Sequence, residues 1–145
     1  PLGVTNLAKG IELVPKAELN CAMAEAMARF AADIVRPAAR TVMGRELAAV
    51  SHASAYVCRP RHNGMKLSEH AFGNALDIAS FTFRDGSSVE VGPNQDEKQR
   101  KFLDHVRKAA CGPFKTVLGP GSDPDHEKHL HLDLAPRRNG SIFCQ

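Results

Sequence analysis

The chain has 145 residues, a formal net charge of +3 and 24% charged residues, values ordinary for a globular protein, so we expect one domain over residues 1–145. The mildly basic balance identifies no polyanionic partner, and we expect no nucleic-acid binding. No run approaches the roughly 20 apolar residues that cross a bilayer, which excludes a membrane span in this chain. Tryptophan is absent and aromatic residues are 6% of the chain, which predicts an aliphatic core.

The first half of the chain predicts an extended segment, a helix and a strand. Residues 10–15 predict a short extended segment, and residues 17–36 a helix because their apolar side chains recur at helical spacing. Pro37 should break or kink this helix, and Gly44 should end a further turn. Residues 47–58 are rich in small and β-branched side chains and predict a strand, after which a loop follows.

The second half alternates strands with one helix. We expect Asn94 to cap that helix, with Glu97 three positions later. The expected elements are a strand at 75–83, a turn at 84–88, a hairpin partner at 89–91, the helix at 94–110 and strands at 114–119 and 129–135. This mixed order predicts an α+β fold, with a largely antiparallel central sheet and helices packed on one side.

Two stretches carry candidate metal-binding side chains. In "HLHLDL", alternate residues of a strand share a face, so His129, His131 and Asp133 point one way and the leucines the other. In "ALDIA", Asp77 faces away from its apolar neighbours, and His70 precedes it through a loop with a glycine. Imidazoles and a carboxylate on neighbouring strands suit zinc, with a fourth position left for water. We therefore expect a zinc site on the open face of the sheet.

Simpler interpretations compete with a metal site. A single histidine is more often a polar surface residue, and we place His52, His62 and His105 in that class. The stretch "HEKH" is not the HExxH metalloprotease motif, because its histidines, His126 and His129, are three positions apart rather than four.

The cysteines suggest an oxidising compartment. Cys21, Cys58, Cys111 and Cys144 are spread along the chain without CxxC spacing, so reduced core cysteines or disulfides are both open. We favour two disulfides and an exported protein. Among the three connectivities, Cys111–Cys144 is the preferred pair, because both residues flank elements expected at the same sheet edge.

The two motifs also resemble a known superfamily. "SEHAFGNALD" is similar to the SxHxxGxAxD pattern of the lysostaphin, D-alanyl-D-alanine metallopeptidase and sonic hedgehog superfamily, and "HLH" to its HxH pattern. More narrowly, "YVCRPRHNG", "LSEHAFGNALDIASF", "CGPFKTVLGPGSDPDHEKHLHLDLAPR" and the cysteine next to the last residue resemble the bacterial extensin-like protein C-terminal domain. This likeness covers most of the chain.

The resemblance implies roles for particular residues. It implies one zinc ion per chain, held by His70, Asp77 and His131. His129 would lie beside the metal and bind substrate or stabilise the transition state. His126 matches an extra histidine of the penicillin-insensitive murein endopeptidase branch. Ser68 would hydrogen-bond near the site, and Arg59 matches a basic residue that neutralises substrate or oxyanion charge.

The resemblance further implies a function. Carboxypeptidase members place a general-base glutamate three residues before the last zinc histidine, and here that residue is Lys128. We therefore expect a zinc-dependent endopeptidase acting on peptidoglycan stem peptides, exported to the periplasm or cell envelope and monomeric. The alternatives are a D,D-carboxypeptidase and a non-catalytic, zinc-bearing cell-wall binding module.

Overall fold

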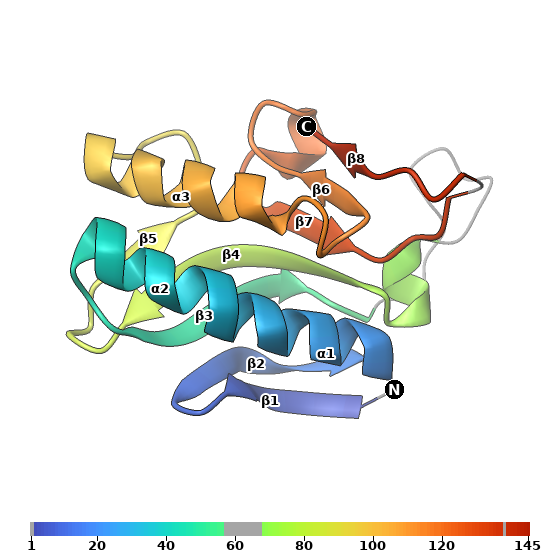
Figure 1. Cartoon of the computed structure of the whole chain (residues 1–145), viewed down its shortest axis with the longest axis horizontal. Helices are drawn as coiled ribbons and strands as arrows, with labels where there is room; N and C mark the ends of the chain where they lie inside the picture. The colour runs from blue at the N-terminus through green and yellow to red at the C-terminus, as the bar shows by residue number, and fades with distance from the viewer. Residues whose placement is uncertain (1, 57–67, 138) are drawn as a thin grey trace.

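A mostly antiparallel sheet forms the centre of the protein. The computed structural model describes residues 2–56, 68–137 and 139–145, and within them eight strands run in the order β1-β2-β3-β4-β7-β6-β8, with β5 pairing β4 (Figure 1). Among the strands of the described residues, β2–β3 and β6–β8 pair in parallel and the other pairs are antiparallel. The strands are β1 (Leu2–Ala8), β2 (Ile11–Leu19), β3 (Leu47–Ser54), β4 (Ala75–Phe83), β5 (Ser88–Glu90), β6 (Thr116–Leu118), β7 (Leu130–Asp133) and β8 (Phe143–Cys144).

Two long helical segments cover one face of this sheet (Figure 1). The first is a continuous run of α1 (Cys21–Phe30), η1 (Ala31–Val35), α2 (Arg36–Ala38) and η2 (Ala39–Met43). The second is α3 (Glu97–Ala110). Two single turns, η3 (Glu69–Phe72) and η4 (Pro124–His126), lie in the connections. The prediction of an α+β fold with helices on one side of a largely antiparallel sheet is confirmed.

The core lies between the helices and the sheet. Alternate residues of the central strand, Leu76 and Ile78, are fully buried there with helical residues such as Met27 and Phe102. Most of the buried hydrophobic side chains are leucine, isoleucine, valine, alanine or methionine, as expected, but aromatic rings also contribute to the core. Among the largest fully buried side chains are five phenylalanines, and Phe102 packs edge-on against Phe81 with ring centroids 5.4 Å apart. Phenylalanines are few in this chain, but the helices and strands concentrate them in one layer.

The first helix begins later than predicted. Residues 17–19 end strand β2, and the helix begins at Cys21 because the Asn20 side chain accepts a hydrogen bond from the Met23 amide at 2.8 Å. The prediction failed because burial alternates along β2 up to Leu19, which fits a strand as well as a helix. Strand β1, which pairs with β2, was not predicted.

Pro37 does not end the first helical run. The chain remains helical to Met43 and terminates at Gly44, whose φ of 66° is left-handed. On both sides of Pro37 the turns widen to π-type hydrogen bonding, with the Arg36 amide bonded to the Ala31 carbonyl, which accommodates the proline within the helix.

The second helix is capped two residues later than expected. Asp96, rather than Asn94, is the cap, and its side chain and that of Gln99 hydrogen-bond reciprocally to each other's backbone amides. Among the described residues, no helix combines the length and the apolar character that crossing a membrane would need.

Candidate metal centre

Two neighbouring strands place Asp77 and His131 side by side. Strands β4 and β7 pair antiparallel, with Asp77 directly opposite His131. Opposed residues of an antiparallel pair project from the same face. Leu76 and Ile78, which flank Asp77, enter the core beneath the helices, so the two polar side chains lie on the opposite face of the sheet. The candidate site is therefore on the face that the helices leave open.

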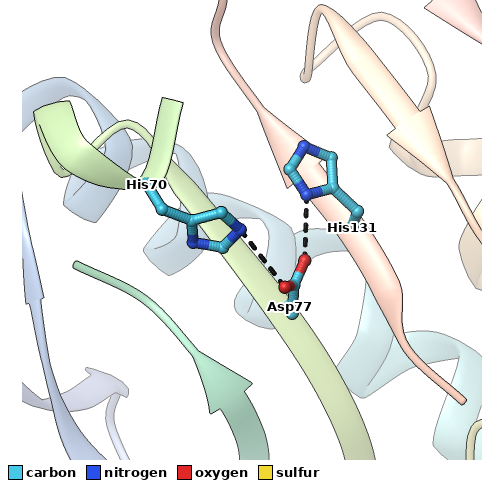
Figure 2. Close-up of side chains that lie close together, drawn as sticks. All are labelled: His70, Asp77 and His131. Carbon is cyan, nitrogen blue, oxygen red and sulfur yellow. Dashed lines mark hydrogen bonds and ion pairs between the residues drawn. The ribbon is translucent and has the colours of Figure 1, made fainter. Parts of the chain in front are cut away.

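His70 reaches the same point from the turn η3, immediately before β4 (Figure 2). The Ser68 hydroxyl accepts a hydrogen bond from the His70 amide at 3.2 Å and caps this turn. Gly73 ends it with a φ of 66°, and a Cβ there would lie 3.0 Å from the Asn20 backbone nitrogen. Gly73 is the glycine of the loop between His70 and Asp77, and it combines a left-handed turn with a close approach to the backbone of the first helix cap.

Each of the two imidazoles is oriented by a hydrogen bond at the ring nitrogen that does not face Asp77. His70 Nδ1 lies 2.5 Å from the Ala55 carbonyl oxygen, which can only accept, so Nδ1 carries the proton and Nε2 presents a lone pair. His131 Nε2 lies 2.7 Å from Asp133 Oδ2, and its Nδ1 lies 2.9 Å from Asp77 Oδ1. Both rings thus direct an imidazole nitrogen toward the Asp77 carboxylate.

The donor set fits a divalent metal ion. Each of His70, Asp77 and His131 offers one ligand atom, and these atoms lie within 4.8 Å of one another. The Nε2 atom of His70 is buried and has no hydrogen-bond partner, although it is 3.2 Å from Asp77 Oδ2. A buried nitrogen lone pair without a donor is costly, and a metal ion would satisfy it. Two imidazoles and one carboxylate are a typical set for zinc with one open position. The three residues could hold a metal ion.

Opposite charges dominate the electrostatics of this cluster. Burial by itself raises the pKa of the Asp77 carboxyl, but the hydrogen bond with His131 and the close approach of His70 outweigh burial and hold the pKa well below its usual range. Burial likewise lowers the pKa of His131, but hydrogen bonds to Asp133 and Asp77 outweigh it and raise the pKa to about 9. The cluster is thus built to hold positive charge between carboxylates, as a proton or as a metal ion.

The cluster lies in an open cleft of about 950 Å³, a size typical of ligand sites. His126, from η4, has its ring centroid 5.5 Å from that of His131, and its Nδ1 lies 2.6 Å from Asp123 Oδ1. When the His126 ring is neutral, Asp123 accepts the Nδ1 hydrogen, and Nε2 is left able to take up a proton. His129 and Ser68 also line the cleft. The structure therefore brings these three residues into the same cleft as the cluster.

Asp133 was on the predicted histidine face but received no role from the sequence. Its Oδ2 holds His131, and its Oδ1 accepts a hydrogen bond from the Ala135 amide at 2.9 Å. Burial raises the pKa of Asp133, but its hydrogen bonds, first that with His131, outweigh burial and lower it. The spacing of His131 and Asp133, two positions apart on one strand, was the available signal, since metal-binding histidines usually donate to a carboxylate or carbonyl.

The structure describes some, but not all, of the other residues that the sequence analysis considered. Arg59 and His62 lie outside the described residues. Half-buried His52 makes a contact between Nε2 and the Pro15 carbonyl at 2.8 Å, and His105 is exposed on α3, which agrees with their assignment as ordinary polar residues.

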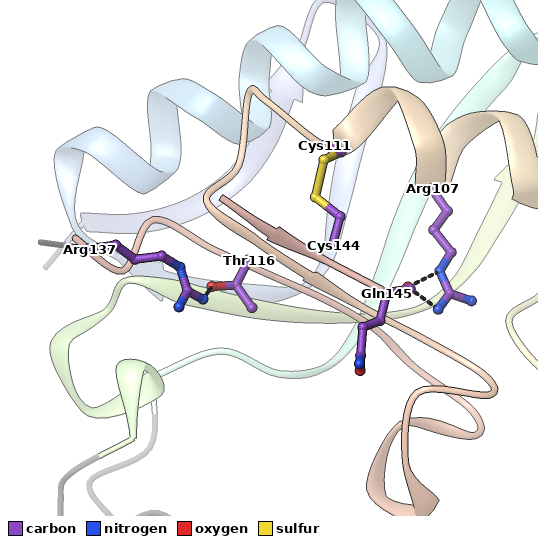
Figure 3. Close-up of a disulfide and its surroundings, with 6 residues drawn as sticks. All are labelled: Arg107, Cys111, Thr116, Arg137, Cys144 and Gln145. Atoms are coloured by element: carbon purple, nitrogen blue, oxygen red, sulfur yellow. Dashed lines mark hydrogen bonds between the residues drawn. A yellow bond between two sulfur atoms is a disulfide. The ribbon is translucent and has the colours of Figure 1, made fainter. Parts of the chain in front are cut away.

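One of the two predicted disulfides is present. Cys111 and Cys144 are bonded, which confirms the preferred pair (Figure 3). Cys21 is exposed and has no disulfide partner among the described residues, and Cys58 lies outside them, so a second pair stays a prediction. The disulfide suggests an oxidising location outside the cytoplasm.

Comparison with known proteins identifies a family. The family model described as "Extensin-like protein C-terminus" matches residues 1–145, which is the whole chain. No curated protein and no solved structure gave a match.

Proposed function

Because the chain belongs to the extensin-like protein C-terminal family, we propose that it is a zinc-dependent peptidoglycan endopeptidase that hydrolyses peptide cross-links. One observation carries the proposal: a buried histidine–aspartate–histidine cluster opens into a cleft beside a further histidine that is held by a carboxylate. The motif likeness to the lysostaphin, D-alanyl-D-alanine metallopeptidase and sonic hedgehog superfamily supports the reaction class. We further propose a monomeric single domain that acts in the periplasm or cell envelope.

In this proposal His70, Asp77 and His131 hold one zinc ion, and the chain's other residues orient them. A bound zinc ion would supply Lewis-acid chemistry, making water a usable nucleophile near neutral pH and polarising the scissile carbonyl. Asp133 and the Ala55 carbonyl keep the two imidazole protons on the nitrogens that face away from the ion.

The proton transfers are assigned to His126. Its Nε2 takes a proton from the attacking water as the oxygen–carbon bond forms, and Asp123 stabilises the imidazolium that results. The same Nε2 then gives this proton to the amide nitrogen as the carbon–nitrogen bond breaks, so a carboxylic acid and an amine leave. His129, on the cleft lining, would bind the substrate or stabilise the developing oxyanion.

The absence of a glutamate at the general-base position of the carboxypeptidases supports an endopeptidase over a D,D-carboxypeptidase. Lys128 occupies the position of the carboxypeptidase general base, and both it and the adjacent Glu127 are exposed and do not line the cleft. A histidine is thus better placed than a glutamate of this segment to move protons.

The proposal is tested by incubating the zinc-loaded protein with purified sacculi, with and without a chelator, and identifying released muropeptides by mass spectrometry. The variant His126→Ala should keep its zinc and lose about 10²- to 10⁴-fold in cleavage rate. His129→Ala should behave similarly, with weaker substrate binding. Asp77→Ala should lose its zinc, and the control His105→Ala, on exposed α3, should change neither property.

Two results would contradict this interpretation in different ways. If His126→Ala retains zinc and cleaves sacculi at the wild-type rate, the histidine-assisted mechanism is wrong. If the wild type binds zinc but releases nothing from several types of sacculus, the non-catalytic binding module becomes the better interpretation.

A further inference from the structure

The described lining of the cleft carries one permanent positive charge, on Arg137. The same lining includes four acidic residues, Glu69, Asp77, Asp125 and Asp133. Apart from a metal ion or a proton held by the cluster, the Arg137 guanidinium is therefore the group of the described cleft lining that is permanently able to attract an anionic part of a substrate.

Neutral groups hold Arg137 in place. Its Nη2 donates a hydrogen bond to the Thr116 hydroxyl oxygen at 3.0 Å (Figure 3). Its guanidinium carbon lies 5.4 Å from the centroid of the Phe143 ring. No carboxylate of the described residues forms an ion pair with it, in contrast to Arg40, which is paired with Glu46. A guanidinium has five N–H donors, so most of those on Arg137 remain for a ligand.

Strand β8, which carries the Phe143 ring that Arg137 contacts, is fixed to the rest of the protein by several interactions. Phe143 belongs to β8, where its amide donates to the Lys115 carbonyl at 2.7 Å. The next residue, Cys144, is joined to Cys111 at the end of α3. The carbonyl of Gln145 then accepts hydrogen bonds from the Arg107 guanidinium (Figure 3). Because β8 is anchored at Phe143 and at the two residues that follow it, the ring offers the exposed Arg137 side chain a fixed contact.

Arg137 is connected to the metal cluster by a short series of side chains. Thr116 lies directly opposite Asp133 in the pairing of β6 with β7, and Asp133 holds His131. The guanidinium thus contacts the strand next to the one that carries His131, in the same cleft. A substrate that reaches the cluster can place a group on Arg137 within the same cleft.

We infer that Arg137 is a specificity residue that binds a carboxylate of the substrate peptide, so that the cleft selects anionic peptides. A planar guanidinium matches a carboxylate through two parallel hydrogen bonds, which lysine cannot reproduce. The inference rests on the proposed function for the peptide nature of the substrate. The carboxylate can come from the end of the peptide or from a side chain near the scissile amide.

The test uses three synthetic cross-linked peptides of equal length. One has all carboxylates free, one has only the terminal carboxylate converted to an amide, and one has only the side-chain carboxylate converted. Each is measured with the zinc-loaded wild type, Arg137→Gln, Arg137→Lys and the control Arg100→Gln, which changes an exposed arginine of α3 that does not line the cleft. The readouts are kcat/KM and, separately, the affinity of a fluorescently labelled peptide for the Asp77→Ala protein, with and without Arg137→Gln.

For the free peptide, Arg137→Gln should lower kcat/KM and peptide affinity by about 10-fold or more, the scale of a hydrogen bond to a charged group. Arg137→Lys should recover only part of the loss, and Arg100→Gln should match the wild type. One of the two amidated peptides should be insensitive to Arg137→Gln, and that peptide identifies the carboxylate that is bound.

Equal losses on all three peptides would overturn the inference, because they would indicate a structural role for Arg137. Unchanged affinity in Arg137→Gln would overturn it as well. If the wild type cleaves none of the peptides but binds the free one in an Arg137-dependent manner, the endopeptidase proposal fails and the carboxylate site stands.

Discussion

Replacing Asp133 by asparagine should weaken zinc binding without removing a zinc ligand. Asp133 accepts two hydrogen bonds, from His131 Nε2 at 2.7 Å and from the Ala135 amide at 2.9 Å. Asparagine has a single acceptor oxygen and an NH₂ group in place of the second. One of the two donors must therefore face another donor, or His131 must change its tautomer.

Both orientations open to the asparagine side chain remove the carboxylate that accepts the His131 Nε2 hydrogen, so both should weaken zinc binding. If the amide oxygen accepts from Ala135, the NH₂ group faces His131 Nε2 and drives the imidazole proton to Nδ1, the atom that would bind zinc. If the oxygen accepts from His131, the Ala135 amide loses its partner, at about 1–3 kcal/mol. Loss of such a supporting carboxylate typically costs about 10- to 100-fold in metal affinity, or about 1.4–2.7 kcal/mol.

The assay is competition for zinc with a chromophoric chelator, with circular dichroism to check that the variant is folded. Asp33→Asn is a suitable control, because Asp33 is exposed on the first helical run, away from the cleft. A folded Asp133→Asn protein with wild-type zinc affinity would refute the role of Asp133 in fixing the His131 tautomer.

Removing the disulfide should destabilise the fold, and the raised pKa of His131 should make both zinc binding and metal-free stability depend on pH. The double variant Cys111→Ser/Cys144→Ser should lose about 3.7 kcal/mol in urea unfolding, the loop-closure value for a sequence separation of 33, and a loss below about 1 kcal/mol would contradict it. Zinc must displace a proton from His131, whose pKa is raised to about 9, so zinc affinity should rise about tenfold per pH unit from pH 7 to 8, and a flat profile would contradict this. For the metal-free protein, the stability of the fold should instead fall as pH rises. The folded pKa lies above the ordinary value of 6.5, so the stabilisation is complete below about pH 6.5 and is lost as pH rises through about 9, which thermal unfolding of the metal-free protein would detect.

Patterns within one strand were predictable because they are local. Side chains alternate along any strand with a period of two, so "HLHLDL" and "ALDIA" already divided the core-facing from the site-facing residues. The predicted strand at 75–83 has the observed bounds of β4, and β7 lies within the predicted 129–135. The polar candidates of the site were accessible from the sequence for this reason.

Local patterns failed where two structures fit the same residues. Residues 17–19 suit the end of a strand and the start of a helix equally, and their pairing with residues 2–4 of β1 decides for the strand. Pro37 is a helix breaker by its own chemistry. Here the wide turns around it and the burial of flanking residues such as Val35 and Ala38 keep the run helical.

The order of residues along the chain is enough to predict which side chains share a face of each strand, and that two histidines and an aspartate could bind a metal. The folded chain was needed to learn that Asp77 lies opposite His131, a residue 54 positions away, and that the Ala55 carbonyl and Asp133 fix the two imidazole tautomers. It also shows that Arg137 reaches the same cleft. Strand register depends on backbone hydrogen bonds and burial that are shared between distant segments, so it cannot be inferred from the residues of one segment alone.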